Sequence, residues 1–195
     1  GPLGIDIMAE ATGQMPLPGD EYWTESFLST NAYGQGIATT PLQMVTAVSA
    51  LANHGEMMQP YVVQEVRSAN GTLVHEPSVL SRPISAQTAE QVTQMAIAAV
   101  SREVPEAQLP GYTIAGKTGT AEIAENGIYL DNATIGSFIG WLPADDPALI
   151  ILVKLDKPQV SPWGSQTAAP AFAKLAKELV VLMDIPPDDI RHRED

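Results

Sequence analysis

Apolar residues recur at helical spacing in three parts of the chain, residues 40–55, 85–100 and 167–183. In each part, apolar positions three or four apart form one stripe, which is typical of a helix with a single buried face. Ser85 can cap the second helix, and Pro41 suits the first turn of the first one. The pattern therefore predicts three amphipathic helices.

The shorter period of β-strands appears in three later segments, residues 112–121, 134–142 and 148–155. The last of these is almost entirely apolar. Residues 143–147 read Pro-Ala-Asp-Asp-Pro and predict a tight turn, so the second and third strands should pair antiparallel. Residues 61–76 predict a separate β-hairpin, because Val-rich stretches lie on both sides of an Asn-Gly pair.

The remaining segments carry weaker signals. Residues 5–38 are rich in Gly, Pro, Ser and Thr and predict extended loop with little regular structure. Residues 1–4 resemble the remnant of a cleaved expression tag, and residues 189–195 form a charged tail that we expect to be frayed. One unit, residues 5–188, is left for the fold.

The amino-acid composition excludes several classes of function. Of the 195 residues 45% are hydrophobic, which permits a folded core, and the net charge of −13 argues against nucleic acid as a partner. The absence of cysteine excludes disulfides and thiolate metal sites, and His54, His75 and His192 lack the spacing of metal ligands. No apolar run reaches the ~18 residues of a membrane span. We therefore expect a soluble chain with no metal.

One motif permits two interpretations. The segment from Gly111 to Thr118 matches every fixed position of the phosphate-binding loop, and Asp156 after an apolar strand mimics a magnesium-binding motif. That loop requires a buried strand before it and a helix after it. Residues 101–110 are too polar and proline-rich for a core strand, and residues 119–127 allow two helical turns at most. The context argues against a P-loop nucleotide-binding protein.

The second interpretation places Lys117-Thr118-Gly119-Thr120 on a strand. Lys-Thr-Gly is one of three motifs of serine acyl-transfer enzymes of the penicillin-binding and β-lactamase type. In such a site Lys117 supplies positive charge, the hydroxyls of Thr118 and Thr120 bind a carboxylate, and Gly119 lets substrate approach the strand. A strand N–H near Thr120 can donate to the oxyanion.

Further segments, all in the same order, make the chain resemble class B penicillin-binding proteins. The matching stretches are Gly4-Ile5-Asp6-Ile7 with Glu10-Ala11-Thr12-Gly13, Tyr33-Gly34-Gln35-Gly36-Ile37, Thr40-Pro41-Leu42-Gln43, Ala52-Asn53-His54-Gly55 with Pro60-Tyr61, Pro110-Gly111-Tyr112, Ala115 to Ala121, and Ser137 to Ala144. The resemblance extends over residues 4–188 as a whole, so residues 5–188 resemble the C-terminal part of a transpeptidase domain. Residues 101–108 depart from the family, which often has a Gly-Thr segment there.

The resemblance implies a fold and a reaction. The fold is α/β (α+β), a five-stranded antiparallel sheet with helices on both faces, of which this chain would keep three strands. The reaction is D,D-transpeptidation, in which a serine is acylated by a D-alanyl-D-alanine stem peptide of peptidoglycan and the acyl group passes to a neighbouring amine. β-Lactams would mimic that substrate, and no cofactor is implied. The parent protein would be anchored in the cytoplasmic membrane with this domain outside.

The nucleophile of that family is not in this sequence. The family acylates the serine of Ser-x-x-Lys, and no lysine here has a serine three positions before it. The triplet Ser29-Thr30-Asn31 matches Ser-x-Asn, but it precedes Tyr33, where the family does not place that motif. We therefore expect the chain alone to be inactive.

Two further expectations remain. The strand at residues 148–155 would lose its neighbour, and an exposed apolar edge favours self-association. An alternative function is a non-catalytic homologue in which this chain is an interaction module, although the intact motif at Lys117 argues mildly against it.

Overall fold

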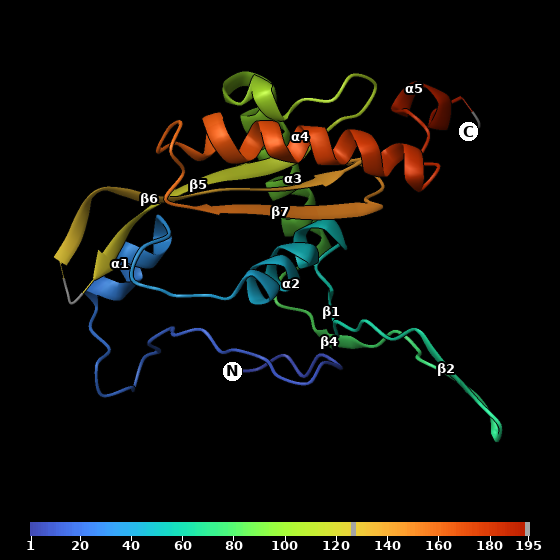
Figure 1. Ribbon diagram of the computed structural model, residues 1–195, viewed down its shortest axis with the longest axis horizontal. Coiled ribbons are helices and arrows are strands. Elements are labelled where there is room, and N and C mark those ends of the chain that lie inside the picture. The colour runs from blue at the N-terminus through green and yellow to red at the C-terminus, as the bar shows by residue number, and fades with distance from the viewer. Residues whose placement is uncertain (126–127, 194–195) are drawn as a thin grey trace.

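A three-stranded antiparallel sheet lies at the centre of the molecule (Figure 1). The computed structural model describes residues 1–125 and 128–193. The strands lie in the order β5-β6-β7, and each pairs antiparallel with its neighbour. Their bounds are β5 Ala115–Glu125, β6 Ile128–Leu142 and β7 Leu149–Asp156.

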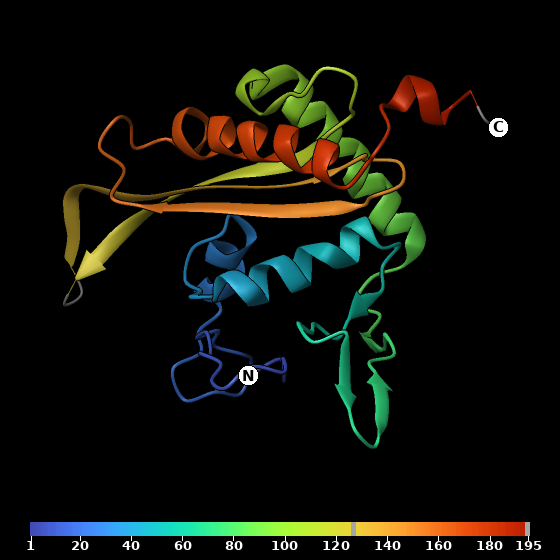
Figure 2. The same ribbon diagram turned by 45° about the vertical axis from the view of Figure 1, so that its right-hand side comes forward.

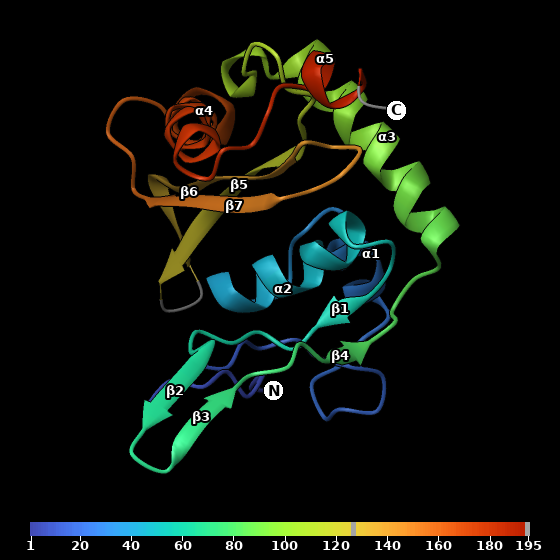
Figure 3. The ribbon, with the colours of Figure 1, turned by 90° about the vertical axis from the view of Figure 1, so that its right-hand side faces the viewer.

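Helices cover both faces of this sheet. Helix α4, Gly164–Leu182, packs on one face, and α2, Pro41–Ala52, lies on the opposite face (Figure 3). Helix α3, Ala86–Glu103, runs past the β5 side of the sheet and contributes to the packing on both faces. The short 3-10 helix η1, Pro105–Ala107, follows it. This arrangement confirms the predicted α/β class.

The main core fills the space between the sheet and α4. Phe138 of β6 and Phe172 of α4 are fully buried, and their rings meet edge to face with centroids 4.7 Å apart. Glycine residues in β6 and β5, Gly140 and Gly116, leave room for the two rings. A Cβ built on Gly140 would lie 3.0 Å from the Phe172 ring, and one on Gly116 would lie 2.6 Å from the Phe138 ring. Glycine at these positions therefore allows the aromatic pair to pack close to the sheet.

The three predicted helices are confirmed, with small differences at their ends. Thr40 and Gln43 form a reciprocal capping box at the start of α2, and the hydroxyl of Ser85 accepts the N–H of Thr88 at the start of α3. Helix α4 begins at Gly164, three residues earlier than predicted, because no capping side chain marks its start.

The strands differ more from the prediction. The turn between β6 and β7 is confirmed, and so is their antiparallel pairing. However, β5 begins at Ala115 rather than at residue 112, and β5 and β6 continue pairing to Glu125 and Ile128 through a bulge after Glu122. This extension forms an arm that leaves the body of the sheet (Figure 1). It has no apolar alternation, since strands that leave the core need none.

The N-terminal part contains one helix that was not predicted. Helix α1, Ser26–Ala32, lies within residues 5–38, for which loop was expected. None of its residues is buried, so no apolar stripe indicates it in the sequence. The hairpin is confirmed as β2, Glu65–Ser68, and β3, Gly71–Val74, which project from the body (Figure 2). Below α2, β1, Met57–Met58, pairs with β4, Val79–Ser81.

Side-chain clamps fasten the first residues to the region that follows α2. The Asp6 carboxylate accepts the backbone N–H groups of Val62 and Val63 at 2.7 and 2.9 Å. These hydrogen bonds lower the pKa of Asp6 from its ordinary value. Gln59 donates from Nε2 to the carbonyl of Leu3 at 2.6 Å. The loop segment is therefore held in place by polar contacts rather than by apolar packing.

The C-terminal tail was wrongly predicted to be frayed as a whole. Residues Asp188–Arg191 form the short helix α5, whose Arg191 pairs with Asp145 at 2.5 Å and with Asp188 at 2.9 Å. Asp188 in turn accepts the N–H of Thr113 at 2.7 Å, immediately before β5. Charges that lie more than forty positions apart in the sequence order this segment, and a charge pattern alone does not show that pairing.

The ion pair between Arg191 and Asp145 predicts that the stability of the fold depends on pH. The hydrogen bond from Arg191 holds the pKa of Asp145 well below its usual 3.8. A carboxylate with a lowered folded-state pKa stabilises the fold above its unfolded pKa and loses that contribution as the pH falls through the folded one. Asp145→Asn is therefore expected to lower the free energy of unfolding by about 0.5–1 kcal/mol at pH 7, as for partly exposed ion pairs.

This difference should shrink as the pH falls below about 4, because the unfolded wild-type chain then binds a proton at the Asp145 carboxyl group that the folded chain does not bind. Urea unfolding of both proteins between pH 7 and pH 2.5 measures it. The neighbouring exposed Asp146 provides the matched control, Asp146→Asn. A stability difference for Asp145→Asn that stayed constant over this range would show that the charge of Asp145 does not contribute to the stability.

Candidate active site

The predicted motif lies in the first half of β5, at one side of the sheet. Lys117 pairs with Ile139 of β6, and Gly119 pairs with Ser137. Within the described ranges no strand pairs with the other edge of β5. That edge presents backbone N–H and C=O groups that a second extended chain can bind.

The motif is divided between the two faces of the sheet. Gly140 approaches Phe172, so the even-numbered residues of β6 face α4, and their partners Thr118 and Thr120 face the same way. Lys117 and Gly119 face the opposite side, where α2 lies. An extended ligand on the open edge would therefore meet the hydroxyl groups on one side and the ammonium on the other.

The geometry rules out the phosphate-loop interpretation. Gly116, Lys117 and Thr118 lie inside a strand, and that strand continues to Glu125. Gly111 lies in a turn with a φ of +87°, where Tyr112 donates its N–H to Leu109. In the described residues a strand rather than a helix follows the motif directly, so the loop-to-helix turn that a phosphate loop requires is not formed there.

The Lys117 side chain is exposed and turns back on its own strand. Its ammonium donates to the carbonyl of Thr118 at 2.9 Å. A backbone carbonyl uses only one of the three donors of an ammonium, so the rest can meet an anion or a hydroxyl beside the strand.

Ser137 and Gly164 contact the motif, but the sequence interpretation gave them no role in the site. A Cβ on Gly119 would lie 2.5 Å from Oγ of Ser137, so a side chain there would require the Ser137 hydroxyl to turn away. The hydroxyl of Thr120 accepts the N–H of Gly164, the first residue of α4, at 3.2 Å. Both contacts join segments that are distant in the chain. No local pattern could have indicated them, although the glycines themselves are visible in the sequence.

A sequence model that describes the penicillin-binding protein transpeptidase domain matches residues 1–177. The chain belongs to this transpeptidase family. The resemblance to class B penicillin-binding proteins is thereby confirmed.

Curated relatives agree along nearly the whole chain. Stage V sporulation protein D of Bacillus subtilis is 35% identical over 190 residues, which cover 94% of this chain and 29% of the relative. Penicillin-binding protein PbpB of Mycobacterium tuberculosis is 34% identical over 196 residues, with 94% and 29% covered. The chain therefore spans less than a third of the length of these relatives.

Solved structures show the same fold. Penicillin-binding protein 3 of Mycobacterium tuberculosis, in its apo form, matches with a TM-score of 0.84 at 32% identity, covering 95% of this chain and 44% of that one. The same protein has been crystallised with ampicillin and with aztreonam, and both complexes match with a TM-score of 0.85. The described part of this chain therefore has the same fold as the corresponding part of a penicillin-binding protein.

The triplet Ser29-Thr30-Asn31 lies in α1, and the middle residue, Thr30, contacts backbone atoms of its own helix. The Thr30 hydroxyl is within hydrogen-bonding distance of the carbonyl oxygens of Ser26 and Phe27, and a Cβ on Gly36 would lie 2.8 Å from it. The carbonyl of Thr30 also accepts the N–H of Gln35 at 2.9 Å, which ties the Tyr33-Gly34-Gln35-Gly36 loop to the helix. These contacts give Thr30 a structural role.

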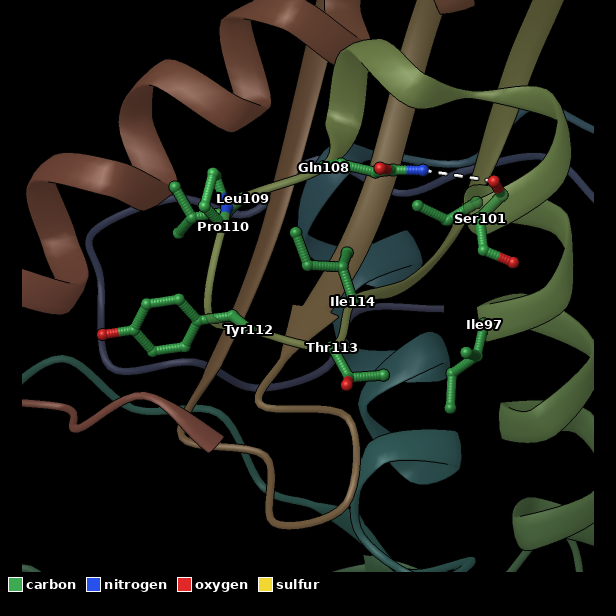
Figure 4. A pocket seen from close by; sticks show the side chains of 9 residues that line it. Ile97, Ser101, Gln108, Leu109, Pro110, Tyr112, Thr113 and Ile114 are labelled. Carbon is green, nitrogen blue, oxygen red and sulfur yellow. Dashed lines mark hydrogen bonds between the residues drawn. The ribbon is translucent and has the colours of Figure 1, made fainter. Parts of the chain in front are cut away.

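A cavity of about 490 Å³ lies between α3 and the chain that enters β5 (Figure 4). Its lining is mainly apolar, with a hydrogen bond of 3.2 Å from Gln108 to the carbonyl of Ser101 at one side. None of the residues of the Lys-Thr-Gly-Thr motif lines it. The lining residues are Ile97, Val100, Ser101, Gln108, Leu109, Pro110, Tyr112, Thr113 and Ile114.

The part of the chain that the structure describes contains neither a metal site nor a membrane-spanning helix. No three His, Cys, Asp or Glu side chains gather there in a way that could hold a metal ion. None of the helices combines the length and the apolar character that a membrane crossing demands. The open edge of β5 is thus the feature with the clearest chemistry.

Proposed function

We propose that the protein containing this segment is a peptidoglycan D,D-transpeptidase and that the segment supplies the substrate-binding side of its active site. The observation that carries the proposal is the position of Lys117–Thr120 on the open edge of an otherwise paired sheet. A relative from Pseudomonas aeruginosa, 26% identical over 193 residues, is named a probable peptidoglycan D,D-transpeptidase.

In the proposed reaction the stem peptide lies extended along β5. A serine hydroxyl attacks the carbonyl carbon of the penultimate D-alanine, and the terminal D-alanine leaves with a proton. An amine of a neighbouring stem then displaces the serine oxygen, which regains its proton. Lys117 provides positive charge beside the nucleophile, and Thr118 and Thr120 hold the terminal carboxylate. A β5 N–H near Thr120 stabilises the oxyanion.

The nucleophile must come from outside these 195 residues, because the sequence contains no Ser-x-x-Lys. The chain alone should therefore bind the substrate edge-on without forming an acyl-enzyme. β-Lactams, which relatives bind in their crystal structures, are the proposed inhibitors of the longer protein. We place residues 5–188 in the domain and expect it to act outside the cytoplasm, with the membrane anchor elsewhere in the longer protein. No observation favours the alternative of a non-catalytic interaction module.

Release of D-alanine tests this function. The longer protein, incubated with a stem pentapeptide that ends in D-alanyl-D-alanine and with an acceptor amine, should release D-alanine and form the cross-linked product. A pentapeptide that ends in L-alanyl-L-alanine is the control and should remain intact. Absence of both products with the first peptide would contradict the proposal.

We also propose that the isolated chain self-associates through β7. No strand pairs with the outer edge of β7 in the described part of the chain. Its apolar residues are buried or half-buried, with α4 on one face and α2 on the other. A strand covered on both faces is typical of a sheet interior. A second copy can supply the neighbour that the resemblance assigns to another part of the domain.

One backbone group allows a sharp test. Lys157 donates its N–H to Thr134 of β6, and bonded pairs alternate in an antiparallel ladder. The N–H of Lys154, three residues earlier, therefore points to the free edge. Lys154→Pro removes this donor without breaking the β6–β7 ladder, whereas Lys154→Ala removes only the side chain.

Light scattering at increasing concentration should show dimers or larger species for the wild type and for Lys154→Ala. Lys154→Pro should shift the population towards monomer. A wild-type chain that remains a monodisperse monomer at every concentration would contradict self-association.

A further inference from the structure

The start of α4 rests directly on the backbone of the motif strand and its neighbour. A Cβ built on Gly164 would lie 2.4 Å from the carbonyl oxygen of Gly119 and 2.4 Å from that of Ser137. Real Cβ atoms essentially never come that close to backbone atoms. Gly164 is also buried. Any side chain at this position must therefore lift the first turn of α4 away from the strands.

The partner strand makes room from the other side. Gly136, which pairs with Thr120 in the register of β5 and β6, would place a Cβ 2.9 Å from the hydroxyl of Thr167 in α4. The chain that leads into α4 is fixed as well, because Thr134 donates its hydroxyl to the carbonyl of Pro162 at 3.0 Å. The approach of α4 to the end of the motif is thus set by several contacts around Gly164.

The contact determines what the Thr120 hydroxyl can do. Its oxygen accepts the N–H of Gly164 at 3.2 Å. A hydroxyl has one proton and two lone pairs, so an oxygen that already accepts a bond keeps its proton free to donate elsewhere. Thr120 is exposed and lies on the open edge of β5. The free proton can therefore point to a ligand on that edge.

We propose that Gly164 is a positioning residue for the Lys-Thr-Gly-Thr strand. Its missing side chain lets α4 reach the strand, and its N–H turns the Thr120 hydroxyl into a donor for the carboxylate of the substrate or of a β-lactam. This inference rests on the proposed function. It adds a residue that is 44 positions from Thr120 in the sequence and does not touch the substrate.

The first experiment measures acylation of the longer protein by a carboxylate-bearing fluorescent penicillin. Gly164→Ala should lower the second-order rate by about tenfold or more, the value of one well-placed hydrogen bond to a charged group. Most of the loss should appear in binding rather than in the maximal acylation rate. Ser165→Ala, one position further along α4, is the matched control and should leave the rate unchanged.

A double-mutant cycle separates positioning from general damage. Thr120→Val removes the hydroxyl and keeps the shape of the side chain. Thr120→Ser keeps the hydroxyl and should be acylated at a rate close to that of the wild type. If Gly164 acts through this hydroxyl, Gly164→Ala should cost much less in the Thr120→Val background than in the wild type. Additive losses, or a Gly164→Ala protein that is acylated at the wild-type rate, would overturn the inference. An unlabelled wild-type protein would instead contradict the proposed function.

Hydrogen exchange in the 195-residue chain tests the bond itself and does not require Gly164→Ala to fold. The Gly164 amide should exchange more slowly in the wild type than in Thr120→Val, while the Ser165 amide should not change. Equal exchange rates of the Gly164 amide in both proteins would overturn the inference.

Discussion

Replacing Lys117 with alanine in the longer protein is expected to lower the rate of acylation by a penicillin about 10²–10³-fold, the usual cost of losing a preorganised electrostatic group at an acyl-transfer site. Lys117 is exposed on β5, and its ammonium is engaged only by the neighbouring carbonyl of Thr118 among the contacts described. Its charge is therefore available to the reacting groups. Time-resolved gel fluorescence with a labelled penicillin measures the rate.

The same substitution should leave folding nearly unchanged, because exposed side chains away from structural contacts contribute within about 0.5 kcal/mol. Lys177→Ala, at an exposed position of α4, is the control and should be acylated as fast as the wild type. Wild-type acylation of Lys117→Ala would remove Lys117 from the proposed active site.

The largest effect on stability is expected at Phe172. This side chain is 0% exposed and packs against Phe138, with Gly140 leaving the space for its ring. Phe172→Ala should lower the free energy of unfolding of the chain by about 3–5 kcal/mol, because the surrounding backbone cannot collapse into the cavity. A loss of that size is a large share of the stability of a typical domain.

Urea unfolding followed by circular dichroism measures this loss. Tyr22, an aromatic residue that is 79% exposed, provides the control, and Tyr22→Ala should change the stability by about 0.5 kcal/mol or less. A loss below about 1 kcal/mol for Phe172→Ala would show that the core between α4 and the sheet is not the main support of the fold.

The elements that the sequence predicted well are those whose signals are local. Helices α2 and α3 carry an apolar stripe and a side chain that can cap their first turn, and the β6–β7 turn carries two prolines. Helix α1 buries no residue, so hydrophobic periodicity could not reveal it. Helix α5 depends on the pairing of Arg191 with Asp145, which only the folded chain brings together.

The candidate site shows the same division. The residues of Lys117–Thr120 were identified from their order in the chain, and the context on both sides correctly argued against a phosphate loop. Their division between two sheet faces follows from strand geometry once the register is known. The role of Gly164 could not be predicted, because a glycine at the start of a helix is ordinary. Only its distance to the Gly119 carbonyl makes it special.

We infer that this chain provides the substrate side of a serine transpeptidase and that the nucleophile lies outside it. Fluorescent penicillin labelling, with the 195-residue chain and the longer protein side by side on one denaturing gel, tests both parts at once. We predict a covalent band for the longer protein, lost after competition with unlabelled penicillin, and no band for the chain. A labelled chain would show that a nucleophile is present in it, and an unlabelled longer protein would contradict the transpeptidase assignment.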